Sequence, residues 1–179
     1  QEGLMSSRMV PFSSILPRLK RVVRQVAAEL HKQAELELGN ISGELDRGIL
    51  ERVVAPLEHM LRNAVDHGIE APELRRERGK QETGSIHIEV SREGGDVLIA
   101  VSDDGAGINL EAVRAKAIER GLLDQDARPG DRELAQFILH PGFSTAATVT
   151  QISGRGVGMD VVSSEIRQMG GSLEIHNRP

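Results

Sequence analysis

Residues 61–68 read LRNAVDHG, residues 103–107 read DDGAG, and residues 154–158 read GRGVG. These three segments are too far apart in the chain to form one turn. In order, they are the end of an apolar-periodic helix that carries Asn63, a strand that runs into Asp103, and a glycine-rich loop that opens a late helix. The combination is typical of the parts of one nucleotide site.

The three motifs resemble, in order and spacing, the ATP-binding domain shared by histidine kinases, Hsp90, type II topoisomerases and MutL. Within that superfamily, LEHMLRNAVDHGIE at 57–70 and GRGVGMDVV at 154–162 are similar to the catalytic domain of CheA-type chemotaxis histidine kinases. The resemblance runs from about Met9 to Ile175. It implies an α+β fold, a two-layer α/β sandwich of the histidine kinase/Hsp90 type, whose mixed sheet has helices on one face.

Composition restricts the class of protein. The 179 residues fit one domain, with 39% hydrophobic and 27% charged residues, and no apolar run is long enough to insert into a membrane. A net charge of −5, three Phe and no Trp or Tyr argue against nucleic acid as a partner. The absence of Cys excludes disulfides and zinc-thiolate sites and agrees with a reducing, cytoplasmic location.

We expect the chain to be a fragment of a longer protein. Residues 1–10 are interpreted as a linker from a preceding domain and residues 11–179 as the ATP-binding catalytic domain. The resembled family continues after a strand at 173–176 into one more strand, whereas this chain stops at Pro179, so the final edge strand is expected to be missing.

Hydrophobic periodicity predicts the order of elements. A charged helical stretch at 72–78 is interpreted as a solvated face. Pro56 is expected to kink or divide the second helix. The other predicted elements are a helix at 13–31, a strand at 34–38 ending in a Gly39-Asn40 turn, a helix at 46–67, a hairpin of 86–90 and 97–101, a helix at 109–120 capped by Asn109, a short helix between 121 and 153, a helix at 157–169 and a strand at 173–176.

Asn63 is the sharpest candidate on the second helix. Residues four apart lie on nearly the same helical face, so His59, Asn63 and His67 can point towards one ligand. Mg²⁺ prefers hard oxygen ligands, which an Asn side chain supplies. By resemblance, Asn63 binds Mg²⁺ between the phosphates, while His59 and His67 lie near the γ-phosphate. Structural roles for the two histidines stay open.

The strand-end motif predicts a base-binding turn. The carboxylate of Asp103 can accept a hydrogen bond from the exocyclic amine of adenine, where guanine presents an oxygen. Gly105 and Gly107 let the backbone approach the base and permit positive φ. Such a motif alone is weak because Asp-Gly turns are common, and Asn63 upstream is what strengthens it.

The glycine-rich loop precedes a helix whose N-terminal amides favour anions. We therefore expect the phosphates to contact the loop, which consists of Gly154, Arg155, Gly156, Val157 and Gly158. By resemblance, Lys116 reaches the phosphates, and Ser144 and Thr145 belong to a lid that orders over bound ATP. A solvated surface remains the alternative for Arg155 and Lys116.

The resemblance implies a histidine kinase that uses ATP and Mg²⁺ to phosphorylate a histidine on a phosphotransfer domain of the same or a partner chain. A response regulator would act downstream in chemotaxis or pilus-driven motility. The whole protein is expected to be a homodimer that meets a coupling protein and receptor through domains absent here. The alternatives are a nucleotide-sensing module that transfers no phosphate and an ATPase clamp of the Hsp90 or MutL kind.

Overall fold

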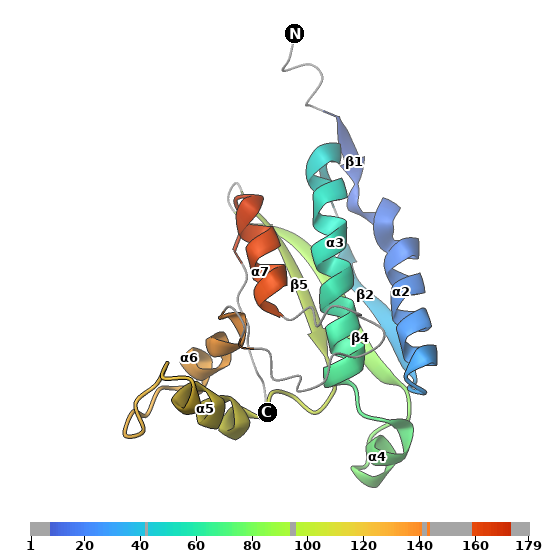
Figure 1. The fold of residues 1–179 in the computed structure, drawn as a ribbon. Helices are drawn as coiled ribbons and strands as arrows, with labels where there is room; N and C mark the ends of the chain where they lie inside the picture. The colour runs from blue at the N-terminus through green and yellow to red at the C-terminus, as the bar shows by residue number, and fades with distance from the viewer. Residues whose placement is uncertain (1–7, 42, 94–95, 141–142, 144–158, 173–179) are drawn as a thin grey trace. The chain divides into compact units, whose positions relative to one another are not determined.

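The computed structural model describes residues 8–41, 43–93, 96–140, 143 and 159–172 (Figure 1). The chain divides into two compact units, 1–106 and 107–179. None of the helices in these ranges combines the length and the apolar character that crossing a membrane requires.

The first unit contains a mixed three-stranded sheet. Its strands are β2 (Ala34–Ile41), β4 (Gly84–Glu93) and β5 (Asp96–Asp103), in the order β2-β4-β5. β2 runs parallel to β4, and β4 runs antiparallel to β5, which confirms the predicted hairpin. A second, two-stranded antiparallel sheet joins β1 (Met9–Pro11) to β3 (Glu44–Asp46). Met9 and Val10 of the expected linker therefore lie in a strand.

Helices cover one face of the larger sheet, as the two-layer expectation requires. In Figure 1, α2 (Leu16–Glu29) and α3 (Arg47–Asn63) run side by side over the strands. They follow η1 (Phe12–Ile15) and β3 respectively, and α3 leads into η2 (Ala64–Gly68) and then α4 (Pro72–Glu77). The buried residues of the two helices and of β4 form the core: Leu19, Val23, Val26, Leu57, Leu61, Ile86, Ile88 and Val90.

Local sequence explains where the two long helices begin. Pro17 lies in the first turn of α2, where its missing N–H costs no helical hydrogen bond. Asp46 caps α3, because its carboxylate accepts hydrogen bonds from the amides of Gly48 and Ile49 at 2.9 and 3.3 Å. Pro56 lies inside α3 without dividing it, so of the two expected outcomes, a kink or a division, the division is wrong.

The predicted turn at Gly39-Asn40 is also wrong, since β2 continues to Ile41. A Cβ on Gly39 would lie 2.5 Å from side-chain atoms of both His87 and Glu89 on β4. Glycine is therefore used here for close approach inside a strand and not for a turn. β2 pairs with β4 on both sides of this position, at Leu38 and at Ile41, with a register shift between the two.

The second unit contains α5 (Leu110–Glu119), α6 (Asp131–Gln136), η3 (Phe137–Leu139) and α7 (Met159–Gln168). The predicted cap of α5 is confirmed, because Asn109 accepts a hydrogen bond from the Ala112 amide at 3.1 Å. A buried cluster of Val113, Ala117, Leu134 and Phe143 joins α5 to α6. The predicted strand at 173–176 lies outside the described residues.

Candidate nucleotide site

The helix that carries Asn63 changes character at that residue. α3 ends at Asn63 and continues as a π-helical turn, η2, closed by a 2.8 Å hydrogen bond from the Ile69 amide to the Ala64 carbonyl. His59 and Asn63, both half-buried, are one α-helical turn apart, whereas the four-residue step from Asn63 to His67 spans a π turn. π turns are rare in proteins, and those that do occur are frequently located at functional sites.

A lysine in the turn after α2 donates hydrogen bonds to carbonyls of η2. Lys32 Nζ donates hydrogen bonds to the backbone oxygens of Val65 and Asp66 at 2.9 and 2.7 Å. Burial lowers the pKa of Lys32, while the carboxylates of Asp66 and Glu70 act in the opposite direction. Lys32 thus joins two helices at the end that carries the candidate metal ligand.

The Asp103 turn packs against the last residue of η2. A Cβ on Gly105 would lie 2.0 Å from the Gly68 carbonyl oxygen, which also accepts a 2.9 Å hydrogen bond from the Ala106 amide. A Cβ on Gly68 would lie 3.1 Å from the Asp103 carboxylate oxygens. The backbone contact excludes a Cβ at Gly105, whereas a Cβ at Gly68 would be tight against the Asp103 side chain. The structure thus brings two of the three sequence motifs together.

The two glycines of the Asp-x-Gly-x-Gly motif serve different purposes. Gly107 has a φ of +78°, as predicted for this motif. Gly105 instead provides room for the Gly68 carbonyl, and it is not among the positive-φ glycines of the described chain. Its amide donates a 2.9 Å hydrogen bond to Asp103 Oδ1, which orients the carboxylate.

Two further carboxylates, those of Asp104 and Glu70, lie close enough to Asp103 to affect its pKa. Burial of the carboxylate raises the pKa of Asp103, the Gly105 amide opposes this effect, and the neighbouring carboxylates of Asp104 and Glu70 raise it further. Asp103 is exposed to solvent, so its carboxylate can reach a ligand.

A cluster of charged residues lies directly behind this turn and was missed by the sequence prediction. The Arg75 side chain is 1% exposed and binds Glu70 Oε1 at 3.0 Å and Asp104 Oδ2 at 3.1 Å. Lys80 Nζ and Arg78 Nη1 bind the other Glu70 oxygen at 2.9 and 3.3 Å. The solvated-face interpretation of 72–78 is therefore wrong for Arg75, although the neighbouring Arg76 is exposed.

Glu70 is the centre of the charged cluster. Its side chain is 3% exposed. Burial alone would raise the pKa of Glu70, but the hydrogen bond from Lys80 and the charges of Lys80 and Arg75 prevail and lower it to about 2. Glu70 is consequently ionised throughout the physiological range.

The other predicted site residues lie in the second unit or outside the described residues. Gly107 begins the second unit, and Lys116 lies on α5 with its Nζ 5.8 Å from the centre of the Phe143 ring. Lys116 is half-buried, which differs from the solvated-surface alternative. The remaining candidates lie outside the described residues: Ser144, Thr145, Gly154, Arg155, Gly156, Val157 and Gly158.

The donor set near η2 suits a magnesium nucleotide in part. The Asn63 amide oxygen is a hard ligand, and Mg²⁺ usually completes its shell with water and phosphate oxygens. The described residues hold no group of three or more His, Asp or Glu side chains that could bind a metal alone. A single Asn ligand is compatible with an ion that arrives with its nucleotide.

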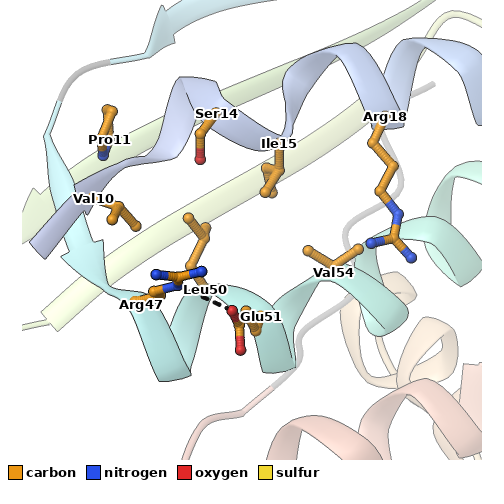
Figure 2. A pocket seen from close by; sticks show the side chains of 9 residues that line it. All are labelled: Val10, Pro11, Ser14, Ile15, Arg18, Arg47, Leu50, Glu51 and Val54. Atoms are coloured by element: carbon orange, nitrogen blue, oxygen red, sulfur yellow. Dashed lines mark hydrogen bonds and ion pairs between the residues drawn. The ribbon is translucent and has the colours of Figure 1, made fainter. Parts of the chain in front are cut away.

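A separate hollow of about 410 Å³ lies between η1, the start of α2 and the start of α3 (Figure 2). Val10, Ile15, Leu50 and Val54 form its apolar part. Two of its charged lining residues, Arg47 and Glu51, form an ion pair with each other at 3.2 Å. None of the predicted site residues lines it.

The chain is similar to curated chemotaxis proteins CheA from several organisms. The chain is 48% identical to a chemotaxis protein CheA of Klebsiella aerogenes over 99% of its length, and 47% identical to that of Salmonella typhimurium over 99%. It is 41% identical to chemotaxis protein CheA of Bacillus subtilis over 98%. The chain spans about a quarter of these relatives, covering 27%, 26% and 26% of their lengths.

Among solved structures, the histidine kinase domain of a blue-light activated histidine kinase from Erythrobacter litoralis matches 72% of this chain and 51% of its own, with a TM-score of 0.39 and 16% identity. A family model described as histidine kinase-, DNA gyrase B- and HSP90-like ATPase matches residues 53–179, which include the part of α3 that ends at Asn63, the Asp103 turn and the glycine-rich loop. The chain belongs to this ATPase family.

Proposed function

We propose that this chain is the ATP-binding catalytic domain of a CheA-like histidine kinase, which transfers the γ-phosphate of Mg-ATP to a histidine of a phosphotransfer domain. The contact of Gly68 with the Asp103–Gly105 turn carries the proposal. It joins the helix end that bears a metal-binding amide to the turn that bears a base-reading carboxylate. The similarity to CheA proteins over nearly the whole chain supports this choice within the family.

Each residue has a distinct part in this proposal. Asp103, oriented by the Gly105 amide, accepts a hydrogen bond from the adenine amine. Asn63 offers its amide oxygen to Mg²⁺, which when bound neutralises phosphate charge. Lys116 and the loop at 154–158 bind the phosphates, and Ser144 and Thr145 belong to the covering segment. His59 and His67 face the γ-phosphate, and His59 is the candidate acceptor of the proton from the incoming histidine.

Positioning and charge neutralisation supply most of the catalysis in such a reaction. The nitrogen of the acceptor histidine forms a bond to the γ-phosphorus, the bond to the bridging oxygen breaks, and ADP leaves. The phosphorylated domain then passes its phosphoryl group to a response regulator. In the whole protein, which we propose to be a homodimer, further domains would provide the acceptor histidine and the link to a coupling protein and receptor.

A transfer assay tests the proposal. The chain is mixed with γ-labelled ATP, Mg²⁺ and a separately prepared phosphotransfer domain of a chemotaxis kinase, and label on that domain is followed with time. We expect acid-labile label that requires Mg²⁺ and is lost with Asn63→Ala. Nucleotide binding without transfer would indicate a sensing module, and steady hydrolysis without an acceptor would indicate an ATPase clamp; either result would overturn the kinase assignment.

A further inference from the structure

Two cations bind the backbone immediately after the base-reading carboxylate. Lys80 Nζ donates hydrogen bonds to the carbonyl oxygens of Asp104 and Gly105, both at 3.1 Å. Arg75 Nη1 donates to the Asp104 carbonyl at 3.3 Å, and its Nη2 binds the Asp104 carboxylate at 3.1 Å. The residues next to Asp103 are therefore fixed by charged side chains from a different part of the chain.

These cations are themselves held in place. Glu70 binds Arg75 through one oxygen and Lys80 through the other, at 3.0 and 2.9 Å. Arg75 also donates a 2.6 Å hydrogen bond from Nε to the Gln81 carbonyl. Because separating a buried charge from its partners is costly, the cluster resists rearrangement.

The opposite side of the turn is fixed as well. The Ser85 amide donates to Asp104 Oδ1 at 2.9 Å, and the Asp104 amide donates to the Ser85 carbonyl at 3.1 Å. The carbonyl oxygen of Gly68, two residues before Glu70, accepts a hydrogen bond from the Ala106 amide. The turn is thus connected both to β4 and to the helix end that leads from Asn63.

We propose that Lys80, held by Glu70, is a positioning residue that sets the direction of the Asp103 carboxylate and so the preference for adenine over guanine. This inference rests on the proposed function, in which Asp103 reads the base. A hydrogen bond depends steeply on direction, so a turn that shifts loses the adenine amine. Guanine presents an oxygen at that position and gains nothing from the carboxylate, so the ratio of the two affinities reports on the position of the turn.

Arg78 provides a matched control. Lys80 and Arg78 both bind Glu70 Oε2, at 2.9 and 3.3 Å, but in the described structure only Lys80 also has hydrogen bonds to the turn. Lys80→Met and Arg78→Met each remove one positive charge from the same carboxylate. A difference between them isolates the contacts with the Asp104 and Gly105 carbonyls.

The experiment is calorimetric titration of the chain with non-hydrolysable ATP and GTP analogues. We expect Lys80→Met to raise the Kd for the ATP analogue about tenfold and so to reduce the preference for adenine, measured as the Kd for the GTP analogue divided by the Kd for the ATP analogue. Arg78→Met should leave both within about threefold of wild type, and Lys80→Arg, which keeps a charged donor, should recover most of the selectivity. An unchanged ratio in a folded Lys80→Met chain would overturn the proposal.

Hydrogen exchange without nucleotide separates this inference from the proposed function. The amides of Gly105 and Ala106, bonded to Asp103 and Gly68, should exchange faster in Lys80→Met than in Arg78→Met. Equal exchange in the two variants would refute the positioning contact itself. A wild-type chain that binds neither analogue would instead refute the proposed function, and with it the selectivity role.

Discussion

Replacing Arg75 by Met should destabilise the first unit far more than the same change at its neighbour Arg76. Arg75 is 1% exposed and donates four hydrogen bonds, to the Gln81 carbonyl, to Glu70 and to two oxygens of Asp104. Arg76 lies on the same helix but is 64% exposed, with one 3.5 Å ion pair to Glu82. The pair thus compares a buried and an exposed arginine in the same helix.

The magnitude follows from what Arg75→Met leaves behind. Removing one partner of a buried ion pair costs about 3 to 5 kcal/mol. Lys80 and Arg78 still bind Glu70 after the change, so the lower end, about 3 kcal/mol, is expected. The exposed pair of Arg76 contributes about 0.5 kcal/mol or less.

Urea unfolding followed by circular dichroism measures both variants against wild type. Domains of this size have about 5 to 15 kcal/mol of stability, so an Arg75→Met chain should still fold at 25 °C. Equal midpoints for Arg75→Met and Arg76→Met, with unchanged slopes, would refute the interpretation of Arg75 as the buried centre of the cluster.

Three further predictions concern pH, base recognition and the helix end. Because the folded-state pKa of Glu70 is about 2 against an ordinary 4.5, Glu70 contributes about 3 kcal/mol of stability that is present above pH 4.5 and lost as pH falls towards 2. The difference in unfolding free energy between wild type and Glu70→Gln should shrink over that window, and a constant difference would contradict it. Asp103→Asn should weaken binding of an ATP analogue at least about tenfold in calorimetry. Because the pKa of Asp103 is raised above its ordinary value of 3.8, binding by the wild type should also weaken on acidification before the pH reaches 3.8. Asp103→Asn should lack this pH dependence. Lys32→Met removes two hydrogen bonds to carbonyls of η2 and should lower the free energy of unfolding, measured in urea, by about 1 to 3 kcal/mol. Lys20→Met, on the exposed side of α2, should leave the free energy of unfolding almost unchanged. Equal effects of the two changes would argue against the role of Lys32 at the end of the helix.

The sequence predicted the elements with clear periodicity. The hairpin alternates apolar and polar residues on both strands, and β5 ends at Asp103 as expected. Asn109 and Gly68 acted as the predicted start and end signals of their elements. These features depend on local residue order, which is what periodicity and capping rules describe.

The missed features depend on contacts between distant residues. β1 and β3 are three residues each, too short for any alternation to be visible. Gly39 was interpreted as part of a turn because its role depends on the side chains of His87 and Glu89, which lie more than 40 residues further along the chain. Local rules could not give either result.

The sequence indicated candidate ligand-binding residues, but not the charged residues that hold the Asp103 turn in place. Asn63 and Asp103 were selected as candidates because their motifs are distinctive when taken together, and the Gly68 contact brings those motifs together. Glu70, Arg75 and Lys80 are spaced by five residues, a separation typical of no regular face. Of the three, only Arg75 lies in the stretch at 72–78 that was interpreted as a solvated face. Only the fold shows that Arg75 and Glu70 are buried.

Calorimetric titration with a non-hydrolysable ATP analogue, with and without Mg²⁺ and for wild type and Asn63→Ala, tests the central claim most directly. We predict binding to the wild-type chain that weakens when Mg²⁺ is withdrawn, and binding to Asn63→Ala that is weaker and no longer depends on Mg²⁺. A folded wild-type chain that binds no analogue, or one whose binding is indifferent to both changes, would contradict the account of a magnesium nucleotide held between the helix end and the Asp103 turn.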